Sequence, residues 1–181
     1  MAVPSDSEEF RKQFEEGRTK SIPEELARFE WLHSLEESFD AGHLFIGTTA
    51  GYLYNQAAWC YILGLHAPCV MMAGAATEAW LRAVTNAPRG GLKRLIDLAA
   101  ERGRISKPLA ERLHRMRESM RNPVAHGHDA VLFALGMTKV GEATWVAPEG
   151  SDAGLSDAAS AREAIETFFR FVRETLVETP R

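Results

Sequence analysis

Residues 44–86 read LFIGTTAGYLYNQAAWCYILGLHAPCVMMAGAATEAWLRAVTN, and this stretch decides the fold of the chain. Its apolar residues recur with the period of an α-helix, and His66-Ala67-Pro68 supplies a turn between two helical runs. We expect these helices over about 44–63 and 68–86. The first run is apolar on nearly every side, which is typical of a helix in the centre of a bundle. The two runs therefore predict a buried central helical pair.

The absence of Asp, Glu, Lys and Arg between Ala41 and Thr77 raises the alternative of a membrane span. A span needs about 20 mostly apolar residues in a row. Polar residues and glycines interrupt this stretch, and they are Thr48, Thr49, Asn55, Gln56 and His66 together with Gly42, Gly47, Gly51 and Gly64. We therefore expect a helical pair buried in a soluble protein, with no membrane partner.

Cysteine usage and the N-terminus indicate the compartment. Cys60 and Cys69 each lie in an apolar run without a disulfide framework, which is typical of buried, reduced thiols. The first nine residues are acidic and contain no apolar signal-peptide core. Both features favour a cytoplasmic protein.

Amphipathic patterns extend the bundle on either side of the central pair. Acidic helices are expected over about 5–17 and 22–39, because Ser5 and Ser21 each open a capping-box pattern. Downstream, three apolar stripes predict helices over about 91–102, 107–121 and 157–178. The stripes consist of Leu92, Leu95, Ile96 and Ala99, then Leu109, Leu113, Met116 and Met120, and then Ile165, Phe168, Phe169, Val172 and Leu176.

The fold class that these elements predict is all-α, a four- to five-helix up-down bundle. We expect an N-terminal acidic helical extension over residues 1–40 and the bundle over residues 41–181. The runs 131–135 and 144–146 lack the helical period and predict a short β-hairpin before the last helix. Its turn is expected around residues 138–142.

Charge is distributed unevenly along the chain. The formal net charge is −4, but residues 89–128 carry 10 basic and 4 acidic side chains, a net +6. Residues 1–40 carry −6, residues 41–88 are neutral and residues 129–181 carry −4. A local excess of positive charge attracts a polyanion even when the whole chain is negative.

The basic part contains Arg121-Asn122-Pro123-Val124-Ala125-His126. Arg121 and His126 would diverge by about 140° on an undisturbed helix, but Pro123 breaks the helical hydrogen bonding between them. We therefore expect Arg121, Asn122 and His126 to converge on one pocket. A guanidinium offers a fork of donors to phosphate oxygens, and an imidazole moves protons near neutral pH. This combination suits phosphodiester chemistry.

This motif resembles the one that marks the HEPN superfamily, an Arg followed by a polar residue and then, a few residues later, a His. The chain upstream is also similar to bacterial members, in its Ala76-Thr77-Glu78-Ala79-Trp80-Leu81 helix, its Gly91-Leu92 short helix and its basic helix after Ile105-Ser106. The resemblance covers about residues 41–178. Pro123 departs from the family pattern.

The resemblance implies a HEPN-type bundle that dimerises so that two Arg/His motifs meet in one cleft. It implies a metal-independent endoribonuclease without a cofactor, either a toxin neutralised by an antitoxin or a defence effector. Arg121 would stabilise the pentavalent phosphate, His126 would act as general base or acid, and Asn122 would orient the His126 imidazole. The alternative is a non-catalytic HEPN-like module that binds a nucleotide or a protein.

Other residues admit two interpretations each. The motif itself is also compatible with ordinary chemistry at a helix C-terminus, where Arg and His favour the helix dipole. Glu78 either pairs with Arg82 four residues away, the interpretation that we favour, or assists the motif. Basic side chains of the helix before the motif either guide RNA or face solvent; they are Arg112, Arg115 and Arg117. His126, His128 and Asp129 could be metal ligands, but no Cys or further His stands at ligand spacing, so we expect no metal site.

Overall fold

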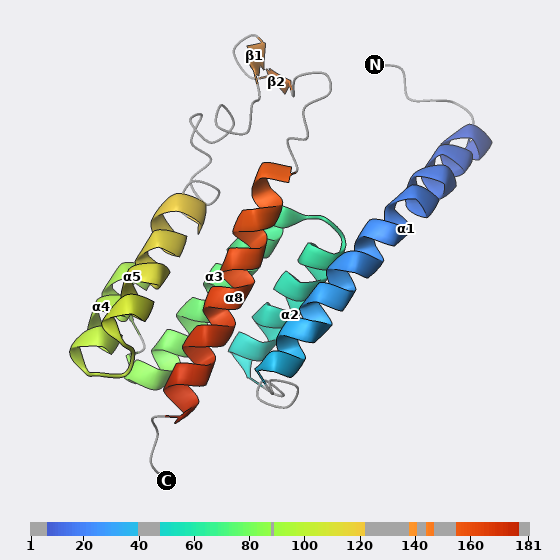
Figure 1. Cartoon of the computed structure of the whole chain (residues 1–181). Coiled ribbons are helices and arrows are strands. Elements are labelled where there is room, and N and C mark those ends of the chain that lie inside the picture. Colours follow the sequence, from blue (N-terminus) through green and yellow to red (C-terminus); the bar gives the residue numbers. More distant parts are fainter. Residues whose placement is uncertain are drawn as a thin grey trace.

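A computed structural model of the chain describes residues 7–39, 48–87, 89–121, 138–140, 144–146 and 155–177. The helices are α1 (Ser7–Ser38), α2 (Thr49–Ile62), α3 (His66–Thr85), α4 (Leu92–Glu101), α5 (Lys107–Arg115), the π-helix η1 (Met116–Arg121) and α8 (Leu155–Val177). In Figure 1, α2, α3 and α8 lie side by side, with α4 and α5 on one flank and α1 on the other. The predicted all-α class is confirmed for the bundle that these helices form.

The centre of the bundle is α3, which packs against α2, α4 and α8. Small side chains on α3 allow close approach, and its buried residues include Cys69, Val70, Ala73, Ala76 and Leu81. Aromatic residues of α8 fill the space opposite, with Phe168, Phe169 and Phe171 all buried. The predicted stripe of α8 is therefore largely confirmed, although Leu176 at its end is exposed.

The first of the two predicted central helices, α2, is not buried on every side. Thr48 caps it by accepting a hydrogen bond from the Gly51 backbone at 2.9 Å, so α2 begins later than the sequence suggested. Tyr52 and Trp59 are 65% and 61% exposed. The prediction that this helix is buried on nearly every side is therefore wrong. One face of α2 meets solvent because α1, α3 and α8 cover only the others.

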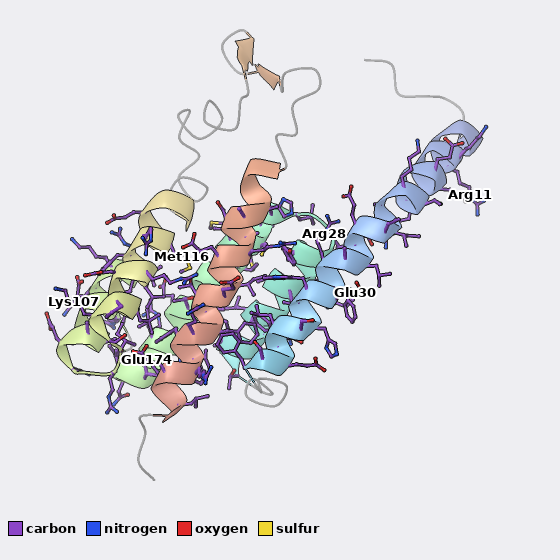
Figure 2. All side chains as sticks on the ribbon, viewed as in Figure 1. Arg11, Arg28, Glu30, Lys107, Met116 and Glu174 are labelled. Atoms are coloured by element: carbon purple, nitrogen blue, oxygen red, sulfur yellow. The ribbon has the colours of Figure 1, made fainter. Side chains whose placement is uncertain are left out.

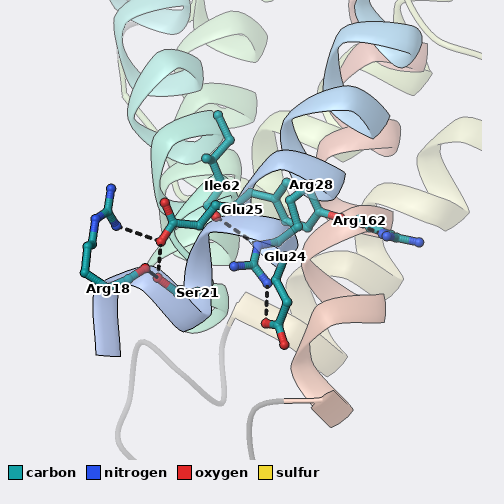
Figure 3. A network of polar contacts seen from close by, with 8 residues as sticks. Arg18, Ser21, Glu24, Glu25, Arg28, Ile62 and Arg162 are labelled. Atoms are coloured by element: carbon teal, nitrogen blue, oxygen red, sulfur yellow. Dashed lines mark hydrogen bonds and ion pairs between the residues drawn. The ribbon is translucent and has the colours of Figure 1, made fainter. Parts of the chain in front are cut away.

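The acidic N-terminal segment forms one helix rather than the two predicted. Pro23 lies inside α1, where a proline removes one backbone donor. Hydrogen bonds between side chains before and after the proline compensate for the backbone hydrogen bond that it removes. The Glu25 carboxylate accepts from Arg18 at 2.6 Å and from Ser21 at 2.8 Å, while Arg28 donates to the Ile62 carbonyl at 2.8 Å (Figure 3).

The second half of α1 belongs to the core. Leu32 is buried, and Trp31, Leu35 and Phe39 pack against the central cluster. The first half extends away from the bundle in Figure 1. The predicted division of the chain at residue 40 stays a prediction.

Two short strands pair antiparallel, β1 (Thr138–Val140) and β2 (Thr144–Val146). Their Cα partners are Thr138 with Val146, Lys139 with Trp145 and Val140 with Thr144. The hairpin was predicted to pair residues 131–135 with 144–146 around a turn at 138–142. The predicted position of the turn is wrong, because Thr138–Val140 forms a strand. Residues 131–135 lie outside the described residues, so their pairing stays a prediction.

None of the described helices combines the length and the apolar character that crossing a membrane requires. Cys60 and Cys69 are both thiols, Cys69 buried and Cys60 half-buried. Burial raises the pKa of the Cys60 thiol.

Candidate functional site

The basic helix before the motif is α5, and its sequence explains where it starts. Ser106 is the N-cap, its hydroxyl accepting from the Leu109 backbone at 3.4 Å, and a proline lies in the first turn. Leu109, Leu113 and Met116 are buried against the bundle, which confirms this part of the predicted stripe. The side chain of Met120 lies outside the described residues.

The end of this helix differs from the prediction. We expected an α-helix to residue 121, but Met116–Arg121 forms the π-helix η1. A π-helix bonds residues five apart, is rare, and is frequent at functional sites. The turn immediately precedes Asn122-Pro123, and in α geometry the Pro123 ring would clash with the Ser119 carbonyl. The irregular turn therefore coincides with the sequence signal for a break.

The three predicted catalytic side chains are not brought together by anything in the described residues. The backbone of Arg121 ends η1, whereas the Arg121 side chain, Asn122 and His126 lie outside the described part of the chain. Their convergence stays a prediction.

Of the three predicted RNA-binding arginines, Arg112 is engaged within the protein. Its Nε donates to the Thr167 hydroxyl at 2.8 Å, and its guanidinium lies 4.0 Å from Glu163 and 3.6 Å from Glu166. Because all three partners are on α8, Arg112 ties α5 to α8.

The other two arginines differ in exposure. The Arg117 side chain is only 14% exposed and forms an ion pair with Glu118. Arg115, by contrast, is exposed on α5. Among the three, exposure favours Arg115 for contact with a ligand.

Glu78 forms the favoured pair with Arg82. The carboxylate lies 2.6 Å from the Arg82 guanidinium, which also donates to the Gly90 carbonyl at 3.0 Å. The pair therefore stabilises the end of α3 and the connection to α4. A role for Glu78 toward the motif stays a prediction.

Two features of the site were missed by the sequence analysis. His114 of α5 lies 2.9 Å from the Asp97 carboxylate of α4. Arg170 and Arg173 of α8 line the same groove as Arg112 and Arg115 of α5. The sequence signal for the second pair was the spacing of Arg170 and Arg173 on the polar side of the apolar stripe of α8.

The described residues contain no group of three or more His, Cys, Asp or Glu side chains arranged to hold a metal ion. His126, His128 and Asp129 lie outside that part of the chain.

Comparison of the chain with protein-family models, with curated proteins and with solved structures gave no match. The fold and the site together define an all-helical bundle whose basic helix ends in a π-helical turn at the arginine of an Arg-Asn-x3-His segment.

Proposed function

We propose that this chain is a metal-independent endoribonuclease of the HEPN type that acts as a homodimer. The observation that carries the proposal is the π-helical turn at the end of the basic helix, whose last residue, Arg121, opens the Arg121–His126 segment. π-Helical turns are rare and are frequent at functional sites, which supports placing the chemistry at this end of the helix.

The chemistry requires only groups of the protein and of the RNA. His126 accepts the proton of a ribose 2′-OH, whose oxygen attacks the adjacent phosphorus. The bond to the 5′-oxygen breaks, leaving a 2′,3′-cyclic phosphate, and a second copy of His126, in its protonated form, donates the proton that completes the 5′-OH. Arg121 donates to the non-bridging oxygens as their charge grows, and Asn122 orients the imidazole.

Exposed apolar side chains support the homodimer. Tyr52, Trp59 and Leu63 follow one another at spacings of seven and four residues, so they share one face of α2. Exposed clusters of large apolar residues mark interaction surfaces in soluble proteins. A proteinaceous antitoxin is a further proposed partner of the same chain.

The experiment is cleavage of a 5′-labelled RNA by wild-type protein and by His126→Ala, both in excess EDTA. We expect cleavage by the wild type, a 2′,3′-cyclic phosphate on the product, and loss of cleavage in the variant. His128→Ala is the matched control, since it removes a histidine two residues away and should retain cleavage.

The ribonuclease proposal fails if wild-type protein does not cleave RNA. It also fails if His126→Ala cleaves as well as the wild type, or if cleavage needs Mg²⁺.

A second candidate function is a non-catalytic module that binds a nucleotide or a protein. The net charge of −4 and the exposed apolar face of α2 favour it. A thermal shift with ATP, together with absence of RNA cleavage, would support this module over the ribonuclease.

A further inference from the structure

A groove with a volume of about 760 Å³ lies between α5 and α8. Four arginines line it, Arg112 and Arg115 from α5 and Arg170 and Arg173 from α8. Among the described lining residues, the only acid is Glu174. Figure 2 shows Glu174 on the side of α8 that faces α5.

The charges of the groove are not equally available to a ligand. The Glu174 carboxylate accepts hydrogen bonds from the backbone and hydroxyl of Ser106 at the start of α5, the hydroxyl at 3.2 Å. Arg112 is held by Thr167, Glu163 and Glu166. The acid and one of the arginines are therefore already used to join α5 to α8.

The two arginines of α8 remain directed to solvent. Arg170 and Arg173 are exposed, and within the described part of the chain neither forms an ion pair. The Arg173 guanidinium lies 5.7 Å from the Phe39 ring centroid, a cation–π contact. With Arg115 opposite them, they make the groove cationic on both walls.

Guanidinium groups bind phosphate oxygens through paired N–H donors, so the groove fits the phosphates of a polyanion. Arg115 and Arg112 precede Arg121 by six and nine residues. The separations along the helix axis are at most about 9 and 14 Å, because an α-helix rises 1.5 Å per residue and the wider π-helical turn rises less. A stacked strand covers that length in roughly three to four nucleotides, at about 3.4 Å each. A single strand seated between α5 and α8 can thus reach the end of η1.

We propose that this groove binds the phosphates of single-stranded RNA through Arg170 and Arg173 and guides the strand toward Arg121; this inference rests on the proposed function. The two walls of the groove come from helices more than 50 positions apart.

The test is RNA binding in the His126→Ala background, where the strand is not cut. Fluorescence anisotropy of a labelled single-stranded RNA is measured over a range of salt concentrations for the parent and for Arg170→Gln/Arg173→Gln. We expect the double substitution to raise Kd by about tenfold and to lower the salt slope by about 1.4, since each phosphate contact contributes about 0.7 on single strands.

The matched control is Lys93→Gln/Arg94→Gln on α4, which removes the same charge from two exposed side chains. Its Kd should stay within about twofold of the parent, because its two charges lie outside the groove. Circular dichroism checks that both double variants are folded. If Arg170→Gln/Arg173→Gln is not folded, the single variant Arg170→Gln is used for the test. Arg170→Lys/Arg173→Lys should recover part of the affinity, because it keeps the charge but loses the paired donors.

The proposed RNA-binding groove is contradicted if both double variants weaken RNA binding equally. It is also contradicted if Arg170→Gln/Arg173→Gln binds RNA as tightly as the parent. Displacement of the RNA by ATP with an equal Kd overturns it as well, since the site would then bind a mononucleotide. If wild-type protein cleaves RNA while the groove double binds normally, the groove fails and the ribonuclease stands. If RNA binding depends on the groove but nothing is cleaved, the ribonuclease fails and the groove stands.

Discussion

Tyr54 connects three helices through a single side chain. Its ring packs against Phe168 and Phe169 of α8, with centroid separations of 5.6 and 5.0 Å, and its hydroxyl donates to the Glu36 carboxylate of α1. Burial, and then the neighbouring Glu36 carboxylate, raise the pKa of Tyr54 far above its usual range. The residue is therefore held protonated in the folded state.

This raised pKa predicts a loss of stability in alkali. The folded pKa lies above the unfolded value of about 10, so the contribution is complete below that pH and is lost as pH rises above it. We expect Tyr54→Phe to cost about 1–3 kcal/mol at pH 7, because the Glu36 carboxylate loses its donor. Urea unfolding at pH 7, 9 and 10.5 measures both effects.

In Tyr54→Phe the fall in stability between pH 9 and 10.5 should shrink, since the titrating group is gone. Tyr52→Phe, the same change at an exposed position of α2, should leave both quantities unchanged. An alkaline loss of equal size in wild type and Tyr54→Phe would contradict the assignment.

At the scale of the element, the start of α5 depends on two contributions from distant parts of the sequence. The Ser106 hydroxyl caps the helix by accepting from Leu109, and Glu174 of α8 accepts from the Ser106 backbone and hydroxyl. A carboxylate at a helix N-terminus is also favoured by the helix dipole. The cap therefore both starts α5 and fastens it to α8.

Ser106→Ala removes the capping hydroxyl and should cost about 1 kcal/mol. For a chain of this size that corresponds to a fall in Tm of about 2–4 °C, measured by differential scanning calorimetry. Ser34→Ala, an exposed serine inside α1, is the control and should not lower Tm, because alanine is the better helix former. Equal Tm values for Ser106→Ala and wild type would show that the cap does not stabilise α5.

At the scale of the whole molecule, α2 presents the apolar face with Tyr52 and Trp59 to solvent. The homodimer proposal predicts that this face meets a second copy. Trp59→Asp should therefore yield a monomer in light scattering after size exclusion, since a charge in an apolar interface is costly to bury. Leu176→Asp, at an exposed leucine of α8, should remain a dimer. A dimeric Trp59→Asp protein would exclude this face as the interface.

Much of the fold could be predicted because helical periodicity and capping are local properties. The structure places α3, α4 and α8 within a few residues of the predicted ranges, and a local cap at Ser106 starts α5. Local rules were misleading at Pro23, where the contacts of Glu25 and Arg28 allow the helix to continue past the proline. They were also misleading from Met116 onward, where a π-helical turn replaces α-helical geometry. The candidate catalytic residues were predicted from the motif alone.

The sequence by itself determined the helical class of the bundle, the stripes that form its core and the basic character of the segment before the motif. The tertiary structure decided which side chains from distant helices meet: Tyr54 with Glu36, Ser106 with Glu174, and the arginines of α5 with those of α8. The physical reason is that periodicity fixes the face of a helix on which a residue lies, whereas the neighbour of that face depends on how the whole core packs.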